Sequence, residues 1–507
     1  MSVTSLVRPF LLRGLSSRMQ AYATQAEAIQ RHILRQLLHT AAKTSWGKRY
    51  NYASIDSYET YASRVPVSLY DDLKALIDRM RHGEPDVLWP GRVKWYAKSS
   101  GTTNDKSKFI PVSTQGLKDT HYRGGADVIR LYLHNEPTSR MFDGRGLILG
   151  GSHASNYNIA GSLVGDLSAI LIENIPSLAN LVRTPSKTIA LLDDFEVKRE
   201  RIALAAIKQR ITNISGVPSW MLSVLTRALE ISGKDTLREL WPDLEVFFHG
   251  GVAFTPYREQ YRQIAGQPDI RYMETYNASE GFFGIQNDPA DPAMLLMIDY
   301  GVFYEFIPMS GIDSPTPMVV PLWEVEAERD YAMLITTSCG LWRYQIGDTV
   351  RFTNTQPYKI IISGRTKSFI NAFGEELVVD NATRGLAEAC KATGAVISEY
   401  TAAPVFMDTQ GKCRHQWVVE FSTPPADAEL FATLLDTALQ RLNSDYEAKR
   451  YKDITLQRLE LIVARPGLFL DWLKSRGKLG GQHKVPRLSN KRDIIDEVLL
   501  LNTPLSE

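Results

Sequence analysis

Apolar residues recur at helical spacing over about the first 45 residues of the chain, and the pattern ends near Trp46-Gly47. This recurrence predicts a helix or a helix pair at the start. The first twenty residues are also rich in Arg and Ser and poor in acids, which is typical of a transit peptide. Because the helical pattern continues beyond them, we favour a structural helix over a targeting segment.

Apolar runs bounded by glycine and polar turns predict strands through the middle of the chain. The predicted strands lie within 87–103, 144–154, 244–251 and 271–281. Helical periodicity predicts helices at 114–133, 202–211 and 220–231. Residues 301–350 are rich in Val, Tyr, Trp, Ile and Thr, which favours antiparallel sheet.

The pattern changes at 361–377, beyond which helices and strands form a second block. This block contains predicted helices at 382–394 and 426–442, and predicted strands at 396–407, 415–422 and 455–463. We therefore predict an α/β (α+β) protein with two domains. Residues 1–365 form a large domain that carries the acyl and nucleotide sites, and residues 366–507 form a small α+β domain.

Composition limits the kind of partner. Lys and Arg number 58 and Asp and Glu number 57, so the formal net charge is +1 and electrostatic capture of nucleic acid is not expected. No apolar run reaches the length of a membrane span, so we expect no membrane partner. Three cysteines at 339, 390 and 413 cannot form a disulfide framework, which favours the cytoplasm. Cys413 and His415 lack a second pair, so a zinc site is not expected.

Four hydroxyl residues surround a glycine after the first predicted strand. They are Ser99, Ser100, Gly101, Thr102 and Thr103, and Lys106 and Lys108 follow them. Glycine allows close backbone approach, and hydroxyl, amide and ammonium groups bind phosphate, so the segment could cradle phosphates. A Ser/Thr-rich surface turn is an equally good interpretation. The segment is not a Walker A loop, and the chain has no GxGxxG.

Three further segments could carry chemistry, and each has an ordinary structural alternative. Glu280, after Tyr276 and Ser279, could hold Mg²⁺ or simply cap a helix. Asp348, after a glycine, could accept from ribose hydroxyls or be a β-turn residue. Lys484, beside Gly480-Gly481, could be delivered to an anion or belong to an exposed basic loop.

Two weaker candidates follow from position alone. Gly250-Gly251 ends an apolar run and is either a sharp turn or a place where a flat ligand meets the backbone. Tyr122 and Arg123 follow His121 on a predicted helix, where a polar solvent-facing surface is the default interpretation.

The order of these motifs resembles that of the adenylate-forming superfamily of luciferase-like and acyl-CoA-synthetase-like enzymes. Within it the sequence is closest to the Gretchen Hagen (auxin-responsive) family of acyl acid amido synthetases, in its bacterial form. The segments that carry the resemblance are YAKSSGTTNDKSKFIPVS, FFHGGVAFTPYREQY, ETYNASEG, LWRYQIGDTVRF, ISGRTKSFINAFGEEL and GGQHKVPRLS.

The resemblance implies a large N-terminal domain of α/β and β-barrel parts with a small hinged C-terminal lid. It implies that ATP and Mg²⁺ activate a carboxylic acid as an acyl-adenylate, which an amine, usually an amino acid, then attacks. The matching ATP-binding residues are Ser99, Ser100, Gly101, Thr102, Thr103, Lys108, Gly250, Gly251, Tyr276, Ser279, Asp348 and Arg365. Glu280 matches the metal residue, Lys484 the catalytic lysine of the lid, and Tyr122 and Arg123 lie where the acid pocket is expected. Nothing requires more than a monomer.

The chain departs from the family at two places. Asp105 places a negative charge beside the expected phosphates, and Gln345 stands where the family often has Arg, for which Arg343 is the nearest replacement. Two other functions stay open: an acyl-CoA ligase that shares the first half-reaction, and a nucleotide-binding protein without catalysis.

Overall fold

The structure is a computed structural model of the chain, and its description covers most residues. The described residues are 2–99, 108–251, 254, 257–312, 314, 316–366, 369–370, 375, 377–405, 413–443, 446–447, 450, 456–477, 484–489 and 491–502.

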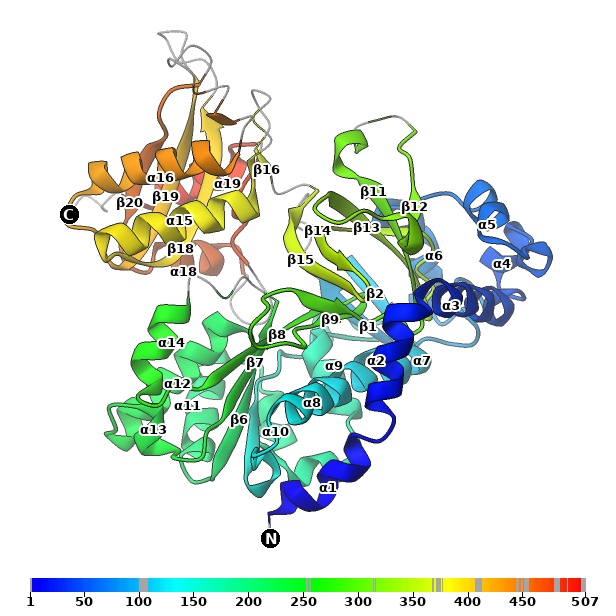
Figure 1. Ribbon diagram of the computed structural model, residues 1–507, viewed down its shortest axis with the longest axis horizontal. Helices are drawn as coiled ribbons and strands as arrows, with labels where there is room; N and C mark the ends of the chain where they lie inside the picture. The colour runs from blue at the N-terminus through cyan, green and yellow to red at the C-terminus, as the bar shows by residue number, and fades with distance from the viewer. Residues whose placement is uncertain are drawn as a thin grey trace.

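Within this part of the chain, one sheet of twelve strands forms the centre of the molecule (Figure 1). Its spatial order is β12-β11-β13-β14-β15-β10-β9-β8-β7-β6-β3-β5. The strands are β3 (Arg145–Ile148), β5 (Arg183–Thr184), β6 (Ile211–Gly216), β7 (Val246–Gly250), β8 (Arg271–Ala278), β9 (Gly281–Ile285), β10 (Met294–Leu296), β11 (Val302–Pro308), β12 (Val320–Pro321), β13 (Asp330–Thr337), β14 (Tyr344–Thr355) and β15 (Tyr358–Arg365).

The sheet has a parallel half and an antiparallel half. Strands β5, β3, β6, β7 and β8 are parallel, and the pairing becomes antiparallel from β8 to β12. The β-barrel part implied by the resemblance therefore takes the form of an antiparallel extension of the same sheet. The antiparallel structure predicted for 301–350 is confirmed by the pairing of β11, β13 and β14.

Helices cover both faces of the parallel half, because alternate residues of each strand point to opposite faces. On β7, Phe247 packs into the core under α11 (Phe195–Ala206), α12 (Pro218–Ser232) and α14 (Arg258–Ala265). Its neighbour Phe248 belongs to the other core, with α8 (Arg123–Asn135). β7 is buried along its whole length, as expected for a parallel strand between two helix layers.

The N-terminal segment is helical, as the pattern predicts. Its helices are α1 (Val3–Leu11), α2 (Leu15–Thr24), α3 (Ala26–Ala41), α4 (Ser45–Arg49), α5 (Tyr58–Arg64) and α6 (Tyr70–Arg81). The rest of the large part contains α7 (Thr114–Gly116), α9 (Leu167–Asn174), α10 (Lys187–Ala190) and α13 (Leu237–Leu240). A three-stranded sheet joins β2 (Lys108–Val112), β1 (Trp95–Ser99) and β4 (Leu163–Gly165).

The C-terminal residues form a smaller α+β unit with its own buried cores, drawn in yellow to red in Figure 1. Its strands are β16 (Phe369–Ile370), β17 (Leu377–Val378), β18 (Val396–Val405), β19 (Arg414–Thr423) and β20 (Glu460–Ala464). Its helices include α15 (Val379–Thr393), α16 (Ala428–Leu442), α18 (Leu468–Ser475) and α19 (Asp493–Asn502). The Gln260 amide donates to Ser422 Oγ at 3.1 Å, so this unit touches α14 of the large part.

One predicted element is wrong in part. The helical pattern of 202–211 holds only to Ala206, where α11 ends, and Ile211 already begins β6. The apolar residues at 211 and 214 therefore belong to a strand. This strand pairs with β7, with Asn213 opposite Val246.

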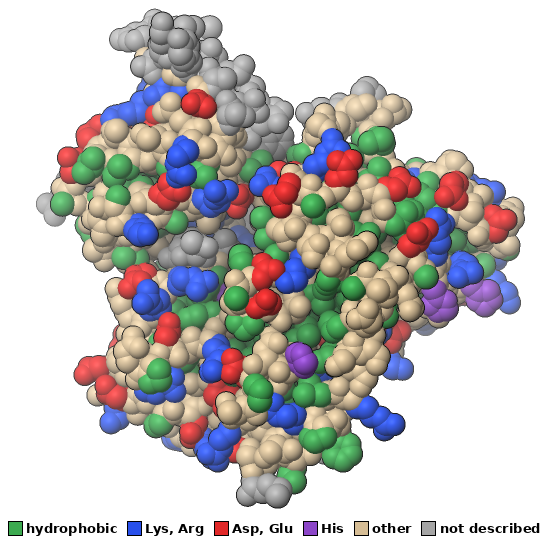
Figure 2. All heavy atoms as spheres, in the orientation of Figure 1, with side chains coloured by type: hydrophobic (Ala, Val, Ile, Leu, Met, Phe, Trp, Pro, Cys, Tyr) green, Lys and Arg blue, Asp and Glu red, His purple; other side chains and the backbone are tan. Residues whose placement is uncertain are grey.

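The outer surface agrees with the balanced composition. Figure 2 shows positive and negative side chains interspersed over the face in view. Among the described helices, none combines the length and the apolar character that a membrane crossing requires.

Candidate active site

A single cavity of about 1360 Å³ brings together most of the expected site residues. Those that line it are Ser99, Tyr122, Gly250, Gly251, Tyr276, Ser279, Glu280, Asp348 and Lys484. These residues span nearly 400 positions of sequence, so only the fold unites them. Ser100, Gly101, Thr102 and Thr103 lie outside the described residues.

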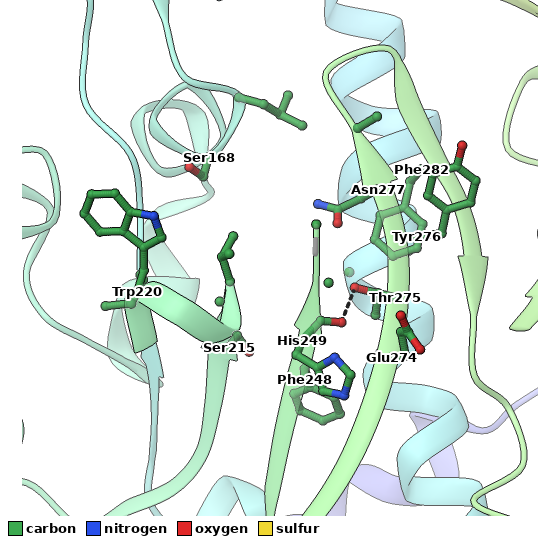
Figure 3. A pocket seen from close by; sticks show the side chains of 18 of the residues that line it. Ser168, Ser215, Trp220, Phe248, His249, Glu274, Thr275, Tyr276, Asn277 and Phe282 are labelled. Carbon is green, nitrogen blue, oxygen red and sulfur yellow. Dashed lines mark hydrogen bonds between the residues drawn. The ribbon is translucent and has the colours of Figure 1, made fainter. Parts of the chain in front are cut away.

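The carboxyl ends of three parallel strands form the floor of this cavity. In Figure 3, Ser215 of β6, His249 of β7 and Glu274 to Asn277 of β8 lie on neighbouring strands, while Trp220 from α12 lies to one side. Thr275 Oγ1 donates to the His249 carbonyl at 3.0 Å and ties two of the strands together. In open α/β sheets, ligands bind outside the carboxyl ends of the strands, which is where this cavity opens.

Glycine is required at the end of β7. A Cβ on Gly250 would lie 2.3 Å from the Thr275 carbonyl oxygen, so any side chain there would push β7 and β8 apart. Gly251 has φ +81°, a conformation that side chains rarely adopt. Both residues line the cavity, and the side-chain atoms nearest to the position of a Cβ on Gly251 are Val217 Cγ2 at 3.5 Å and Lys484 Nζ at 3.9 Å.

Asp348 is held by the tyrosine of another motif. Tyr276 Oη donates to Asp348 Oδ2 at 2.7 Å, which joins β8 to β14 across the cavity. The preceding Gly347 has φ +93°, and its carbonyl accepts from the Thr366 N–H at 2.8 Å. Arg365 is the register partner of Asp348 on β15, and its side chain lies outside the description.

Ser279 and Glu280 form the turn between β8 and β9, and both are buried. Glu280 lines the cavity beside the strand ends. In the described part of the chain, no group of three or more His, Cys, Asp or Glu side chains could hold a metal ion. A cation at Glu280 would therefore take most of its ligands from a bound molecule or from water.

Lys484 reaches the cavity from the C-terminal unit. The segment after it is fastened to β18, because Thr401 Oγ1 donates to the Pro486 carbonyl at 2.7 Å and the Ala402 N–H donates to the Arg487 carbonyl at 2.9 Å. The Lys484 Nζ lies 3.9 Å from the position that a Cβ on Gly251 would take. The ammonium group therefore lies over the end of β7.

Two of the residues that the sequence suggested for the site lie outside the cavity wall. Lys108 is not among the cavity residues, and its Nζ lies 5.8 Å from the centroid of the Tyr70 ring. Arg123 points away, because its guanidinium donates to the Asp299 carboxylate at 2.5 Å and to the Asp299 carbonyl at 2.6 Å.

Arg343 does not replace the missing family arginine. It forms a buried ion pair with Glu305, with N–O distances of 2.8 to 3.1 Å, and donates to the carbonyls of Ala62 and Val65. The left-handed backbone of Arg343, with φ +44°, turns its side chain into the core.

Three sequence profiles of one family match the chain in order. They describe the GH3 family N-terminal domain over residues 15–270, its central domain over 295–365 and its C-terminal domain over 380–493. The chain belongs to the GH3 family. The resemblance inferred from the six motifs is therefore confirmed.

GH3 proteins of known activity align along almost the whole chain. Indole-3-acetic acid-amido synthetase GH3.3 of Arabidopsis thaliana is 24% identical and covers 96% of this chain and 94% of its own length. The solved structure of GH3.15 acyl acid amido synthetase superposes with a TM-score of 0.80 at 19% identity, covering 96% of each chain. A 2-hydroxyisobutyryl-CoA ligase superposes with a TM-score of 0.57 at 12% identity, covering 95% and 93%. These structural likenesses concern the fold, and they confirm the predicted mixed α/β class.

Two titratable residues in the cavity of this GH3 chain escaped the sequence analysis. Burial lowers the pKa of His249 to about 3, and nearby Arg258 acts in the same direction. Burial raises the pKa of Glu274, its register partner on β8, to about 7, although Arg258 opposes the shift. Both lie within predicted strands, and Glu274 precedes Tyr276 by two positions, so strand periodicity could have placed it on the same face.

Lys198 is a third residue of this kind in the GH3 cavity. Its Nζ donates to the Gly151 carbonyl at 2.9 Å, and burial lowers its pKa to about 8 against the opposing charges of Asp166 and Asp193. Lys198 lies on α11, before the start of the helix that the sequence predicts at 202–211, so the sequence gave no signal for it.

Proposed function

We propose that this chain is an ATP-dependent acyl acid amido synthetase, a ligase that forms a carbon–nitrogen bond. It activates a carboxylic acid as an acyl-adenylate, releases pyrophosphate, and transfers the acyl group to an amine, in particular an amino acid. The observation that carries the proposal is the meeting of Asp348, Glu280 and Lys484 at one cavity. The names of the full-length GH3 relatives, which are amido synthetases, support it.

ATP fits the end of the cavity where the strand motifs meet. Asp348, held by Tyr276, has a carboxylate oriented to accept from the two ribose hydroxyls. We assign the adenine to the part of the cavity wall that Gly250 and Gly251 form. Ser99 ends the strand that leads into the hydroxyl-rich segment, which we assign to the phosphates.

Glu280 is the residue that would hold Mg²⁺. Its buried carboxylate is a hard oxygen ligand, and a single protein carboxylate suits a cation that takes its other ligands from phosphates and water. When bound, Mg²⁺ would neutralise charge on the phosphates.

The first half-reaction joins two anions, so cationic groups must compensate their repulsion. Lys484 supplies one such charge at the end of β7. Because Lys484 comes from the C-terminal unit, movement of that unit, divided from the rest near residues 365 and 366, would admit substrates and then exclude water from the acyl-adenylate. We place Lys484 in the adenylation step for this reason.

The acid occupies the apolar arm of the cavity under α8. Val128, Ile129 and Phe248 line this arm, and Tyr122 fixes its rim by donating to the Leu171 carbonyl at 2.9 Å. We leave Arg123 out of the acid pocket because Asp299 already binds it.

Acid-dependent exchange of labelled pyrophosphate into ATP tests the activation step, with a broad panel of carboxylic acids. Mass spectrometry of reactions offered CoA or a mixture of amino acids then identifies the acceptor. We expect exchange and an N-acyl amino acid. A CoA thioester would favour the ligase alternative, and no exchange with any acid would leave only nucleotide binding.

The monomeric state and the cytoplasmic location remain predictions from the sequence. The described structure has three free cysteines, one of them buried, which agrees with a reducing compartment.

A further inference from the structure

Arg183 is a buried guanidinium that no carboxylate compensates within the described residues. Only 3% of the residue is exposed. Its Nε donates to Asn180 Oδ1 at 2.8 Å and its Nη1 to the Pro185 carbonyl at 3.2 Å. Its Nη2 is buried and has no hydrogen-bond partner in that part of the chain. Two neutral oxygens therefore serve a group with five N–H donors.

A buried charge without a counter-charge is costly, and proteins normally pair it or bind a ligand with it. Burial lowers the pKa of Arg183, and no acidic neighbour acts in the opposite direction. Guanidinium groups stay protonated in proteins, so the charge persists. An anion that enters the cavity would compensate this charge.

The surroundings of Arg183 form a built site in the wall of the active-site cavity. Arg183, Gly146 and Asn213 lie in one row across β5, β3 and β6, and all three line the cavity. Because Gly146 has no side chain, the Asn213 amide lies over it: a Cβ there would be 2.6 Å from Asn213 Oδ1. Two strand spacings separate the Cα atoms of Arg183 and Asn213 by about 10 Å.

The row of Arg183, Gly146 and Asn213 lies far from the end of β7, where the reaction is proposed to take place. It continues to Val246 of β7, four residues before Gly250, which is about 13 Å along the strand. On β7, the apolar residue Phe248 lies between the two levels and lines the cavity. A molecule that spans this distance has a polar group at each end and an apolar body.

We propose that the acid activated by this enzyme carries a second carboxylate, remote from the one that is adenylated, and that Arg183 binds it beside Asn213. The inference rests on the proposed function and names its substrate class. A hydroxyl or a carbonyl group would accept hydrogen bonds from Arg183 but would leave its buried charge uncompensated. A carboxylate compensates the charge and can also accept two parallel N–H bonds.

Pyrophosphate exchange with matched acids tests this proposal. Suberic acid is compared with octanoic acid, sebacic with decanoic, and terephthalic with para-toluic acid, together with the corresponding hydroxy acids. We expect kcat/KM for the diacid to exceed that for the monoacid by roughly tenfold to a hundredfold. Arg183→Met should abolish this preference and leave kcat/KM for the monoacid unchanged or higher, while Arg183→Lys should retain part of it.

Arg145→Met is the matched control, because Arg145 donates to the Arg183 carbonyl at 3.1 Å but is absent from the cavity wall. It should keep the diacid preference, and circular dichroism establishes that each variant is folded. If the unaltered enzyme prefers monoacids or hydroxy acids, or if Arg183→Met keeps the diacid preference, the inference is wrong. Exchange with monoacids alone overturns only this inference, whereas exchange with no acid overturns the proposed function as well.

Discussion

Two buried arginines lie in the two halves of the same sheet, and their surroundings differ. In the antiparallel half, Arg343 is 5% exposed and its guanidinium binds the Glu305 carboxylate and two backbone carbonyls. In the parallel half, Arg183 is equally buried but binds only neutral oxygens and faces the cavity. The first charge is compensated within the fold and the second is not. The difference separates an arginine that stabilises the protein from one that is available to a ligand.

The same substitution at both positions should separate the two roles most clearly. Arg343→Met leaves Glu305 buried without its counter-charge, so the free energy of unfolding should fall by about 3–5 kcal/mol. Arg183→Met leaves no carboxylate without a counter-charge, so it should change the free energy of unfolding by less than about 1 kcal/mol. Chemical denaturation measures both values.

The double variant Arg343→Met with Glu305→Leu is the control for this comparison. It removes both charges and should recover most of the lost stability. Equal losses for the two single Met variants would contradict the distinction between the arginines.

Lys484 extends the comparison to a cation that we propose to act on the substrate. Lys484→Ala should reduce adenylation roughly tenfold to a few hundredfold, because a charge-assisted hydrogen bond contributes about 1.5–3 kcal/mol. Pyrophosphate exchange measures the loss, and the melting temperature should stay the same. Lys491→Ala, on the same C-terminal unit but outside the cavity wall, should keep full exchange. Unchanged turnover in Lys484→Ala would remove this residue from the mechanism.

His249 differs from the buried arginines, because it is a buried titratable group that stays neutral. Its folded pKa of about 3 lies below the ordinary 6.5, so stability is fully present above pH 6.5 and is lost as the pH falls. Between pH 7 and 5 the loss should be about 2 kcal/mol. Denaturation at both pH values measures it, and His249→Gln should show a shallower dependence. An identical dependence in the variant would mean that folding does not lower the pKa of His249.

Tyr276 has the smallest expected effect. Tyr276→Phe removes the hydrogen bond to Asp348, which should raise the KM for ATP by roughly fivefold, equivalent to about 1 kcal/mol. Steady-state kinetics with ATP varied measures this change, and kcat should hardly move. A selective loss of kcat would place Tyr276 in the chemical step rather than in ribose positioning.

The sequence predicts two of the strands that form the site, β7 and β8, but not β6, which pairs with β7. β7 and β8 were predicted because their apolar runs end in glycine and small residues, and Asp348 and Lys484 were found because they belong to ordered motifs. β6 was missed because its residues Thr212, Asn213 and Ser215 interrupt the apolar pattern, and the preceding helix has the stronger period.

Long-range pairing explains what the sequence could not provide. Arg123 and Arg343 look alike as polar residues near motifs, yet Asp299 and Glu305, distant in sequence, decide where each guanidinium points. Arg183 carries no local signal either, because its significance depends on the register that places Gly146 and Asn213 beside it. Local periodicity contains no information on such register.

Our proposal requires that one cavity holds the nucleotide, the metal and the acid. A crystal structure with a non-hydrolysable acyl-adenylate analogue tests it most directly. We expect the ribose hydroxyls to lie on Asp348, the adenine against Gly250 and Gly251, and the acyl group under α8 toward Arg183. An analogue bound outside this cavity, or bound within it with Asp348 and Lys484 on surfaces away from the ligand, would contradict the account.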